Sequence, residues 1–333
     1  MALLNHSFSQ GWADPNKLNN NSRQTAILLQ QVRQKFADLL NVRPDEIEFL
    51  GESDLGFELG ISGLLKDESQ MFYSAIDRQR IFAIAQSQEN YGRKVNCLPV
   101  DKNGVINLPT TSEKDVLVWQ VANGETGNIQ TNPKSQALIF ADCTASGVDY
   151  LPEFKYQTAL FDSKSWQGPA GLGILIIKDA EKWRNPSPHN DFTRSLGTYS
   201  IPLAIASSVA LEAYISDADI RAKLKRYLME FISEQISDVD LASNENGLSK
   251  YLSCSFSNVE SDRLLLELEQ FGFAVDSGSA CKSADMQPSH VLAAMGRPIV
   301  GNMRLTLHKD ITEQMVVQFC QALKISVEKL RKN

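Results

Sequence analysis

Short apolar segments alternate with helical segments between residues 22 and 178, and this pattern restricts the fold more than any other feature. Residues 22–40 place apolar side chains at helical spacing, which predicts a helix capped by Asn21 or Ser22. Two more helices are predicted at 60–65 and 80–88. Apolar runs predict strands at 47–50, 71–76, 95–100, 115–122, 137–142, 158–163 and 172–178. Because these strands are apolar on both faces, we expect a mostly parallel α/β sheet covered by helices on both sides.

A second pattern follows the helical region that runs from about residue 201 to 237. Strands are predicted at 251–257, 273–277 and 302–307, and helices at 262–271, 289–295 and 312–330. We therefore expect a large domain over 12–235 and a smaller C-terminal α+β domain over 236–333 together with 1–11.

Composition excludes several classes of function. With 333 residues, 43% of them hydrophobic, the chain can bury a large core, and its net charge of −7 offers no basic stripe for nucleic acid. No apolar run approaches the length of a membrane span, and the start "MALLNHSFSQGW" does not resemble a secretion signal, so a cytoplasmic protein is expected. The five cysteines are widely spaced without a CxxC pair, which predicts free thiols and no structural metal site.

Two residues at predicted strand exits are candidates for cofactor chemistry. Lys164 follows an apolar strand in "ALFDSKSWQGPAG" and is either a solvated loop lysine or a desolvated nucleophilic amine. Asp142 ends the strand "ALIFAD" and either caps a turn or meets a cationic ring nitrogen. A lysine and a carboxylate together suggest pyridoxal phosphate, which needs an imine-forming amine and an acid that keeps its pyridine nitrogen protonated.

Cys281 and Arg304 are the other two candidates. Cys281 lies among glycine, alanine and serine in "VDSGSACKSADMQPSH", which predicts a loop that can carry a thiol to a reaction centre, whereas Cys97, Cys254 and Cys320 have the apolar neighbours of structural cysteines. Arg304 alternates with apolar residues on its predicted strand. It either forms a surface ion pair or grips a substrate carboxylate.

These residues together resemble the cysteine desulfurase family, which lies within the class V aminotransferase group of fold type I pyridoxal phosphate enzymes. The most specific match is "SGSACKSADMQPSHVLAAMG" followed by "MRLTL", and "ANGETGNIQ", "FADCTASG" and "KSWQGPAGLGIL" match other family segments in the same order. The resemblance covers most of the chain, from "GWADP" to the last helix.

The resemblance implies a role for each matching residue. Lys164 would form the imine with the cofactor, Asp142 would contact the pyridine nitrogen, Cys281 would take sulfur from L-cysteine, and Arg304 would bind the substrate carboxylate. Further cofactor contacts are implied for the residues at matching family positions: Ser53, Arg78, Asn123, Ser163 and Thr198. Thr198 resembles the threonine that reaches the phosphate of the neighbouring subunit, which implies a homodimer. Persulfide transfer to an acceptor protein, as in iron–sulfur cluster assembly, is also implied.

The chain departs from the desulfurase pattern around the cofactor. Aligned on Gly168 and Pro169, the family lysine falls at Ser165, although related class V aminotransferases share the spacing of Lys164. Asp54 stands where the family has a phosphate-binding threonine.

Three other family residues near the ring are replaced. Arg78 stands at the place of the ring-stacking histidine, Ala145 at that of a glutamine, and Gly124 at that of an asparagine. The segment between Gln130 and Asp142 is shortened, as though a covering helix were missing. Two alternatives therefore stay open: another class V pyridoxal phosphate enzyme, either an aminotransferase or a lyase, and a non-catalytic relative that acts as a partner protein.

Overall fold

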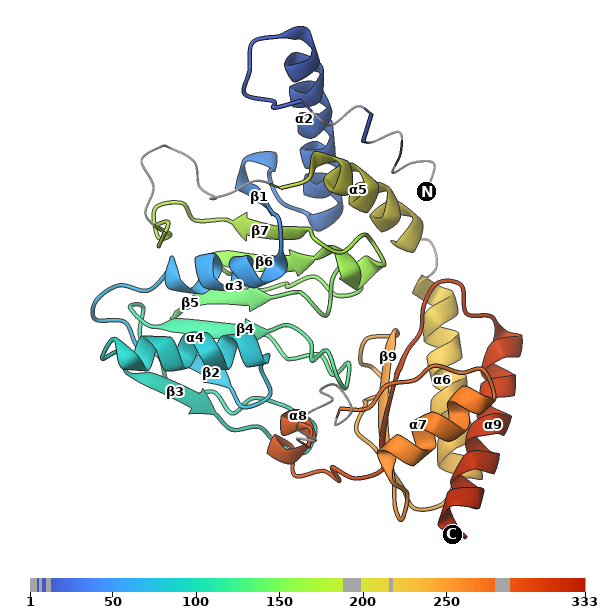
Figure 1. Ribbon diagram of the computed structural model, residues 1–333. Coiled ribbons are helices and arrows are strands. Elements are labelled where there is room, and N and C mark those ends of the chain that lie inside the picture. Colours follow the sequence, from blue (N-terminus) through green and yellow to red (C-terminus); the bar gives the residue numbers. More distant parts are fainter. Residues whose placement is uncertain are drawn as a thin grey trace.

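A seven-stranded sheet forms the centre of the larger part of the molecule (Figure 1). The structure is a computed structural model that describes residues 5, 8–9, 13–187, 199–215, 218–278 and 288–332. The strands follow the spatial order β1-β7-β6-β5-β4-β2-β3. Their bounds are β1 Ile47–Leu50, β2 Met71–Ser74, β3 Val95–Leu98, β4 Val116–Gln120, β5 Leu138–Asp142, β6 Thr158–Asp162 and β7 Gly173–Ile177.

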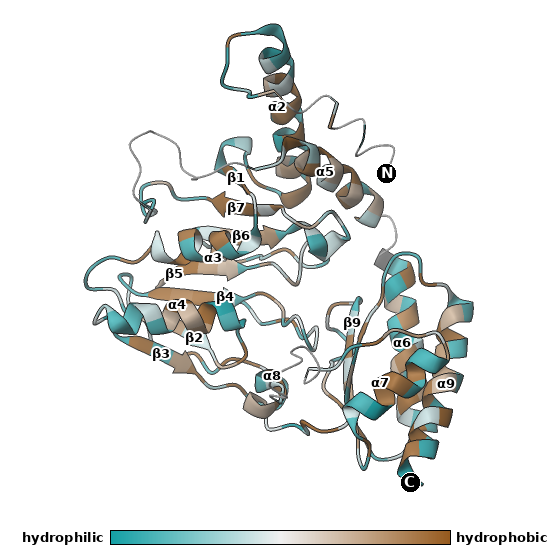
Figure 2. Ribbon diagram, viewed as in Figure 1, coloured by the Kyte–Doolittle hydropathy of each residue, from teal (hydrophilic) through white to brown (hydrophobic). Residues whose placement is uncertain are grey.

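The prediction of a mostly parallel sheet is confirmed. Strands β2 to β6 pair in parallel, and β7 pairs antiparallel with both β6 and β1. Every residue of β4, β5, β6 and β7 is buried, as expected for strands covered on both faces. Figure 2 shows these strands as the most hydrophobic part of the larger domain.

Helices pack on both faces of the sheet, but on one of the two faces they cover only part of it. On the first face, α3 (Ser53–Ser62) and α4 (Gln79–Asn90) pack on the strands, and α3 begins seven residues earlier than predicted. On the other face, α2 (Asn20–Leu40) and α5 (Ile201–Ile215) pack over β1, β7 and β6, next to the short 3₁₀ turns η1 (Pro44–Glu46) and η2 (Ser163–Trp166).

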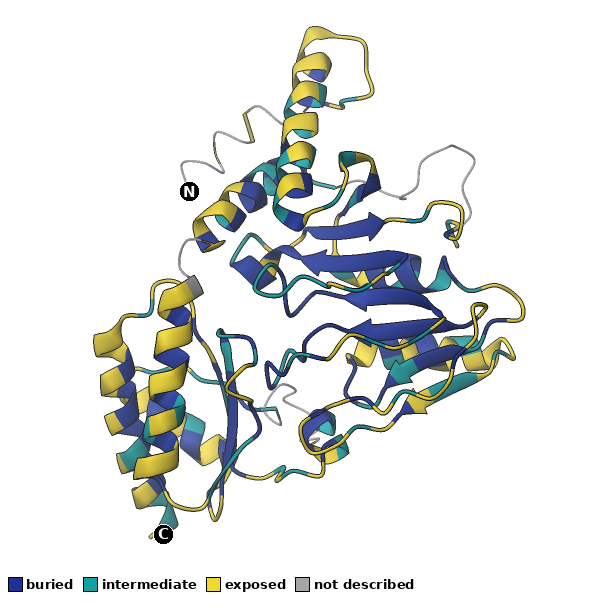
Figure 3. Cartoon of the chain, turned by 180° about the vertical axis from the view of Figure 1, so that it is seen from behind, coloured by how far each residue is buried: buried dark blue, intermediate teal, exposed yellow. Residues whose placement is uncertain are grey.

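Loops cover the remainder of that second face. Ile106, Leu108, Phe154 and Tyr156 belong to loops that pack over β2, β4 and β5, and Figure 3 shows these strands as buried. This half of the sheet is therefore covered on its second face by loops rather than by a helix, as the shortened segment indicated. The cause is the shortened connection between β4 and β5, which contains no helix over residues 121–137.

The C-terminal part has its own sheet and core. Its three strands, in the order β10-β9-β8, are packed by α6, α7 and α9 around one apolar cluster. The bounds are α6 Ala218–Gln235, β8 Val239–Leu241, β9 Tyr251–Phe256, α7 Ser261–Gln270, α8 His290–Ala294, β10 Asn302–Thr306 and α9 Glu313–Arg331. Because α6 contributes Leu224, Leu228 and Ile232 to this cluster, we propose that the domains divide between α5 and α6 rather than after residue 235.

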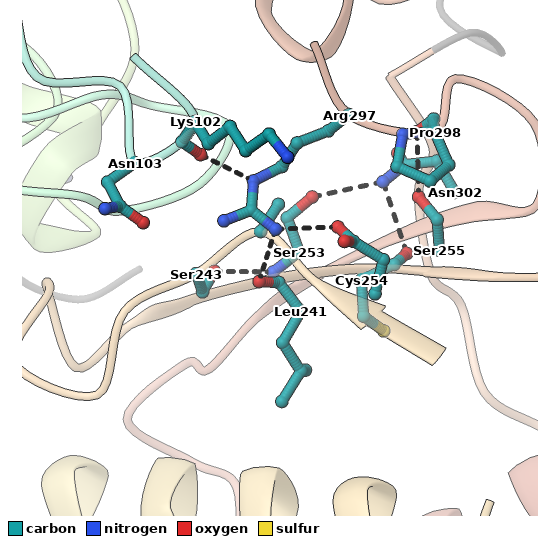
Figure 4. Close-up of polar contacts among 12 residues, drawn as sticks. Lys102, Asn103, Leu241, Ser243, Ser253, Cys254, Ser255, Arg297, Pro298 and Asn302 are labelled. Carbon is teal, nitrogen blue, oxygen red and sulfur yellow. Dashed lines mark hydrogen bonds and ion pairs between the residues drawn. The ribbon is translucent and has the colours of Figure 1, made fainter. Parts of the chain in front are cut away.

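Arg297, which follows α8, forms hydrogen bonds with residues of both domains (Figure 4). Its guanidinium donates to the carbonyl of Lys102 at 2.7 Å, to the Asp240 carboxylate at 2.8 Å and to the carbonyl of Leu241 at 3.0 Å. One side chain thus joins a loop of the large domain to strand β8 of the small one. These bonds help to hold the facing edges of the two domains in a fixed relation.

Two local predictions are wrong. Residues 273–277 do not form a strand, since only Asp276 pairs with β10, opposite Arg304. Cys97 is exposed on the edge strand β3, whereas Cys143, Cys254 and Cys320 are buried, and these four described thiols are free.

Within the described residues, no single helix is long and apolar enough to cross a membrane, and only the bent pair α5 and α6 meets that test by length and composition.

Candidate active site

The predicted site residues gather at the carboxyl edge of the parallel strands. A cavity of about 360 Å³ opens there, lined by residues 76–78 after β2, by residues 120 and 123–125 at the end of β4, and from the small domain by Tyr251, His290 and Arg304. A larger cavity of about 770 Å³ lies at the opposite edge of the sheet and holds none of the predicted site residues. We place the site at the carboxyl edge because ligands of such sheets bind beyond the carboxyl ends of the strands.

Asp142 is buried at the end of β5, and its two oxygens have different surroundings. Oδ1 accepts hydrogen bonds from the backbone N–H of Thr144 at 2.9 Å and from its hydroxyl at 2.6 Å, which caps the turn after the strand. Oδ2 is buried and accepts no hydrogen bond from the described residues. One oxygen of Asp142 therefore caps the turn, which is one of its two predicted roles, and its role toward a ring nitrogen stays a prediction.

Arg78 lies beside that second oxygen. Its Nε is 3.6 Å from Asp142 Oδ2, and its side chain is 42% exposed in the cavity. A side chain at Gly124 would begin 3.4 Å from the Arg78 guanidinium and 3.5 Å from Ala145. Arg78, Gly124 and Ala145, which are three of the departures from the family pattern, therefore lie together. The small side chains at 124 and 145 leave space beside the Arg78 guanidinium.

Asp162 ends β6 and Lys164 follows it, and both lie close to the start of α3. The Lys164 ammonium is 3.5 Å from Asp162 Oδ2, and its side chain is 65% exposed. The same carboxylate accepts hydrogen bonds from the Ser53 hydroxyl at 2.8 Å and from the Lys164 backbone N–H at 2.9 Å. Ser165, the residue after Lys164, is buried, and its hydroxyl has no hydrogen-bond partner among the described residues.

Ser163 and Asn123 do not present free polar groups to the cavity. Ser163 is fully buried, and its hydroxyl lies 2.7 Å from that of Ser207, so the structure does not bring this hydroxyl toward a phosphate. The amide of Asn123 donates to the carbonyl of Ile76 at 3.2 Å, and its oxygen accepts the N–H groups of Glu125 and Thr126 at 2.9 Å. Asn123 thus shapes the turn after β4.

Arg304 is on β10 and reaches the cavity from the small domain, and it forms an ion pair with Asp276. Its neighbours Met303 and Leu305 are buried on the opposite face of the strand, as the alternation predicted. Cys281 and Thr198 lie outside the described residues.

The sequence reasoning missed the roles of two carboxyl groups at the cavity, the buried Asp77 and the half-buried Glu125. Burial raises the pKa of Asp77 well above its ordinary value and also raises that of Glu125. Oδ1 of Asp77 and Oε1 of Glu125 have no hydrogen-bond partner among the described residues. Asp77 lies three residues after the end of β2, so its place at a strand exit is the signal that would have identified it.

These residues fit the ring of pyridoxal phosphate. A buried carboxylate oxygen that accepts no hydrogen bond, such as Asp142 Oδ2, suits the N–H of a protonated pyridine ring. The start of α3 with Ser53 suits a phosphate group, although Asp162 already binds the Ser53 hydroxyl. Among the described residues, no cluster of histidine, cysteine and acidic side chains could hold a metal ion.

Comparison with known proteins assigns the family. The cysteine desulfurase IscS of Dictyoglomus turgidum is 26% identical to this chain. The match covers 97% of this chain and 90% of the relative. Cysteine desulfurase 2 of Trichormus variabilis is also 26% identical, and the match covers 99% of this chain and 90% of that protein. A solved NifS-like protein superposes with a TM-score of 0.84 at 22% identity, covering 98% of this chain and 96% of the other. Residues 2–319 match the family Aminotransferase class-V. The chain therefore belongs to the class V aminotransferases, a family of enzymes that depend on pyridoxal phosphate.

Proposed function

We propose that this protein is a cysteine desulfurase, which uses pyridoxal phosphate to remove sulfur from L-cysteine and leaves alanine and a persulfide on Cys281. The observation that carries the proposal is the buried Oδ2 of Asp142, which accepts no hydrogen bond from the described residues and lies beside Arg78, a residue that lines the cavity together with Arg304. The relatives named cysteine desulfurase support the choice of substrate.

The cofactor would be held by residues from three strand exits. Asp142 would accept the ring N–H, Arg78 would lie against the ring, and Ser53 would contact the phosphate. Lys164 would supply the amine, which requires it to leave its ion pair with Asp162. The bound ring would accept the electron pair that is left when a bond at the α-carbon of the amino acid breaks.

The substrate would be handled by three side chains. Arg304 orients the carboxylate of cysteine through paired N–H donors, and Lys164 moves the α-proton. The Cys281 thiolate attacks the substrate sulfur, so that a sulfur–sulfur bond forms while the bond between sulfur and the β-carbon breaks. The electron pair of the broken bond remains on the β-carbon, which gains a proton to give alanine.

The proposal extends to partners and location. Thr198 would reach the phosphate of a neighbouring subunit, which implies a homodimer that sedimentation can test. The persulfide would pass to an acceptor protein, as in iron–sulfur cluster assembly, within the cytoplasm. The cavity contains both arginine and carboxyl side chains, as expected for a site that binds a zwitterionic amino acid.

The test compares two cysteine variants. Cys281→Ser should abolish persulfide and alanine formation from cysteine and leave the visible absorption band of bound cofactor unchanged. Cys97→Ser is the matched control, because Cys97 is an exposed thiol on the edge strand β3 and should retain full activity. Equal alanine release by wild type and Cys281→Ser would refute the role of Cys281.

One observation favours the non-catalytic alternative. The Lys164 side chain is 65% exposed and paired with Asp162, whereas an imine-forming lysine is expected to be desolvated. Borohydride treatment of the protein with the cofactor, followed by mass spectrometry, separates the two functions. A reduced adduct on Lys164 supports the enzyme, and its absence from every lysine supports the non-catalytic relative.

A further inference from the structure

Asp162 is held by three donors at the start of α3. These are the Ser53 hydroxyl at 2.8 Å, the backbone N–H of Lys164 at 2.9 Å and the Lys164 ammonium at 3.5 Å. The Asp162 side chain is only 12% exposed, so its carboxylate is largely withdrawn from water. Ser53 and Asp162 are 109 residues apart in the chain, which means that the tertiary fold builds this arrangement.

The donors that surround Asp162 are those that an external phosphate would use. A hydroxyl on the first turn of a helix, a backbone amide and an ammonium are the usual partners of a bound anion. Here all three are directed to a carboxylate of the protein itself. A phosphate that binds here must therefore either displace the Asp162 carboxylate from these donors or lie close to it and be repelled by its negative charge.

We infer that Asp162 is an internal anion that competes with the phosphate of the cofactor for the Ser53 hydroxyl and the Lys164 backbone N–H. The inference rests on the proposed function, because it concerns the same cofactor site. Its consequence is that wild-type protein binds pyridoxal phosphate weakly and gains little from the phosphate group relative to pyridoxal, which lacks it.

The test measures four dissociation constants by equilibrium dialysis, for pyridoxal phosphate and for pyridoxal on wild type and on Asp162→Ser. Removing the carboxylate should tighten pyridoxal phosphate binding by about tenfold or more, because the repulsion between two anions is lost. Pyridoxal can gain only from the release of the Lys164 amine, so its binding should tighten several-fold less than that of pyridoxal phosphate. Asp162→Asn keeps the size of the side chain and should show the same selective gain.

A matched control removes one carboxylate elsewhere. Asp262→Ser eliminates an exposed acid at the start of α7 in the small domain and should leave both constants unchanged. A gain of the same size in Asp262→Ser would assign the effect to net charge and would overturn the inference.

The remaining outcomes also decide the question. If Asp162→Ser and Asp162→Asn weaken both ligands equally, Asp162 only positions Ser53 and Lys164, and the inference is wrong. Unchanged pyridoxal phosphate binding in both variants overturns it as well. The proposed function is judged separately by alanine release from wild type. If wild type binds no cofactor and Asp162→Ser binds it, the inference holds while the proposed function fails.

Discussion

At the scale of single residues, the ligand-binding edge is defined by how each polar atom is used. Asp142 directs one oxygen to Thr144 and leaves the other without a hydrogen bond from the described residues. The Ser163 hydroxyl pairs with that of Ser207, whereas the Ser53 hydroxyl donates to Asp162, which also contacts Lys164. The residue type alone therefore does not show which of the two serines places its hydroxyl beside Asp162.

Lys225 gives a pH prediction at this scale. It is buried, its ammonium donates to the carbonyls of Asn244 at 2.8 Å and Leu248 at 3.1 Å, and burial lowers its pKa from 10.5 to about 8. The unfolded state therefore binds more protons between about pH 8 and 10.5. Over that window the free energy of unfolding should rise with pH, by roughly 1–3 kcal/mol in total from this group.

Urea unfolding of wild type and Lys225→Met at several pH values checks this contribution. The variant should lack the rise, since methionine does not titrate, while every other group contributes equally to both proteins. Parallel curves from pH 7.5 to 10 would mean that Lys225 remains charged in the folded protein.

At the scale of elements, α3 depends on glycines that let it approach the sheet. A β-carbon on Gly60 would lie 2.4 Å from the ring of Phe140 on β5, and one on Gly56 would lie 2.3 Å from Leu160 on β6. The close approach keeps the first turn of α3, with Ser53, beside the end of β6. Packing between helix and sheet thus positions the Ser53 hydroxyl next to Asp162.

Substituting Gly60 tests this packing. Gly60→Ala should destabilise the protein by roughly 1–3 kcal/mol, because the clash with Phe140 exceeds the gain of about 1 kcal/mol in helix propensity. In a Phe140→Leu background the same change should cost less, because the contacted ring is gone. Urea denaturation of the four proteins measures the coupling, and an equal cost in both backgrounds would exclude Phe140 as the cause.

At the scale of the whole molecule, a buried charge cluster joins the two domains. Asp149 of the large domain contacts the Lys250 ammonium at 3.0 Å and the Arg221 guanidinium at 3.3 Å, and accepts a hydrogen bond from the Tyr214 hydroxyl at 2.7 Å. Lys250 also donates to the carbonyl of Ser165 at 2.8 Å. Because burial lowers the pKa of Lys250, its charge depends on this one carboxylate.

Removing that carboxylate should weaken the domain junction. Asp149→Asn leaves Arg221 and Lys250 without their buried counter-charge and should cost about 3–5 kcal/mol of unfolding free energy. Glu68→Gln is the control, since its ion pair with Lys114 is exposed on both sides and should contribute below about 1 kcal/mol. Comparable losses in the two variants would show that the buried cluster has no special role.

The sequence alone determined the features that depend on local periodicity. Apolar runs located the strands of the large sheet, Asp142 was placed at a strand exit, and the shortened connection before β5 did lack its helix. The tertiary structure decided which side chains meet: Arg78 beside Asp142, and Ser53 on Asp162. The physical reason is that periodicity indicates which face of an element is buried. Contacts between residues far apart in the chain depend instead on the spatial order of the strands in the sheet.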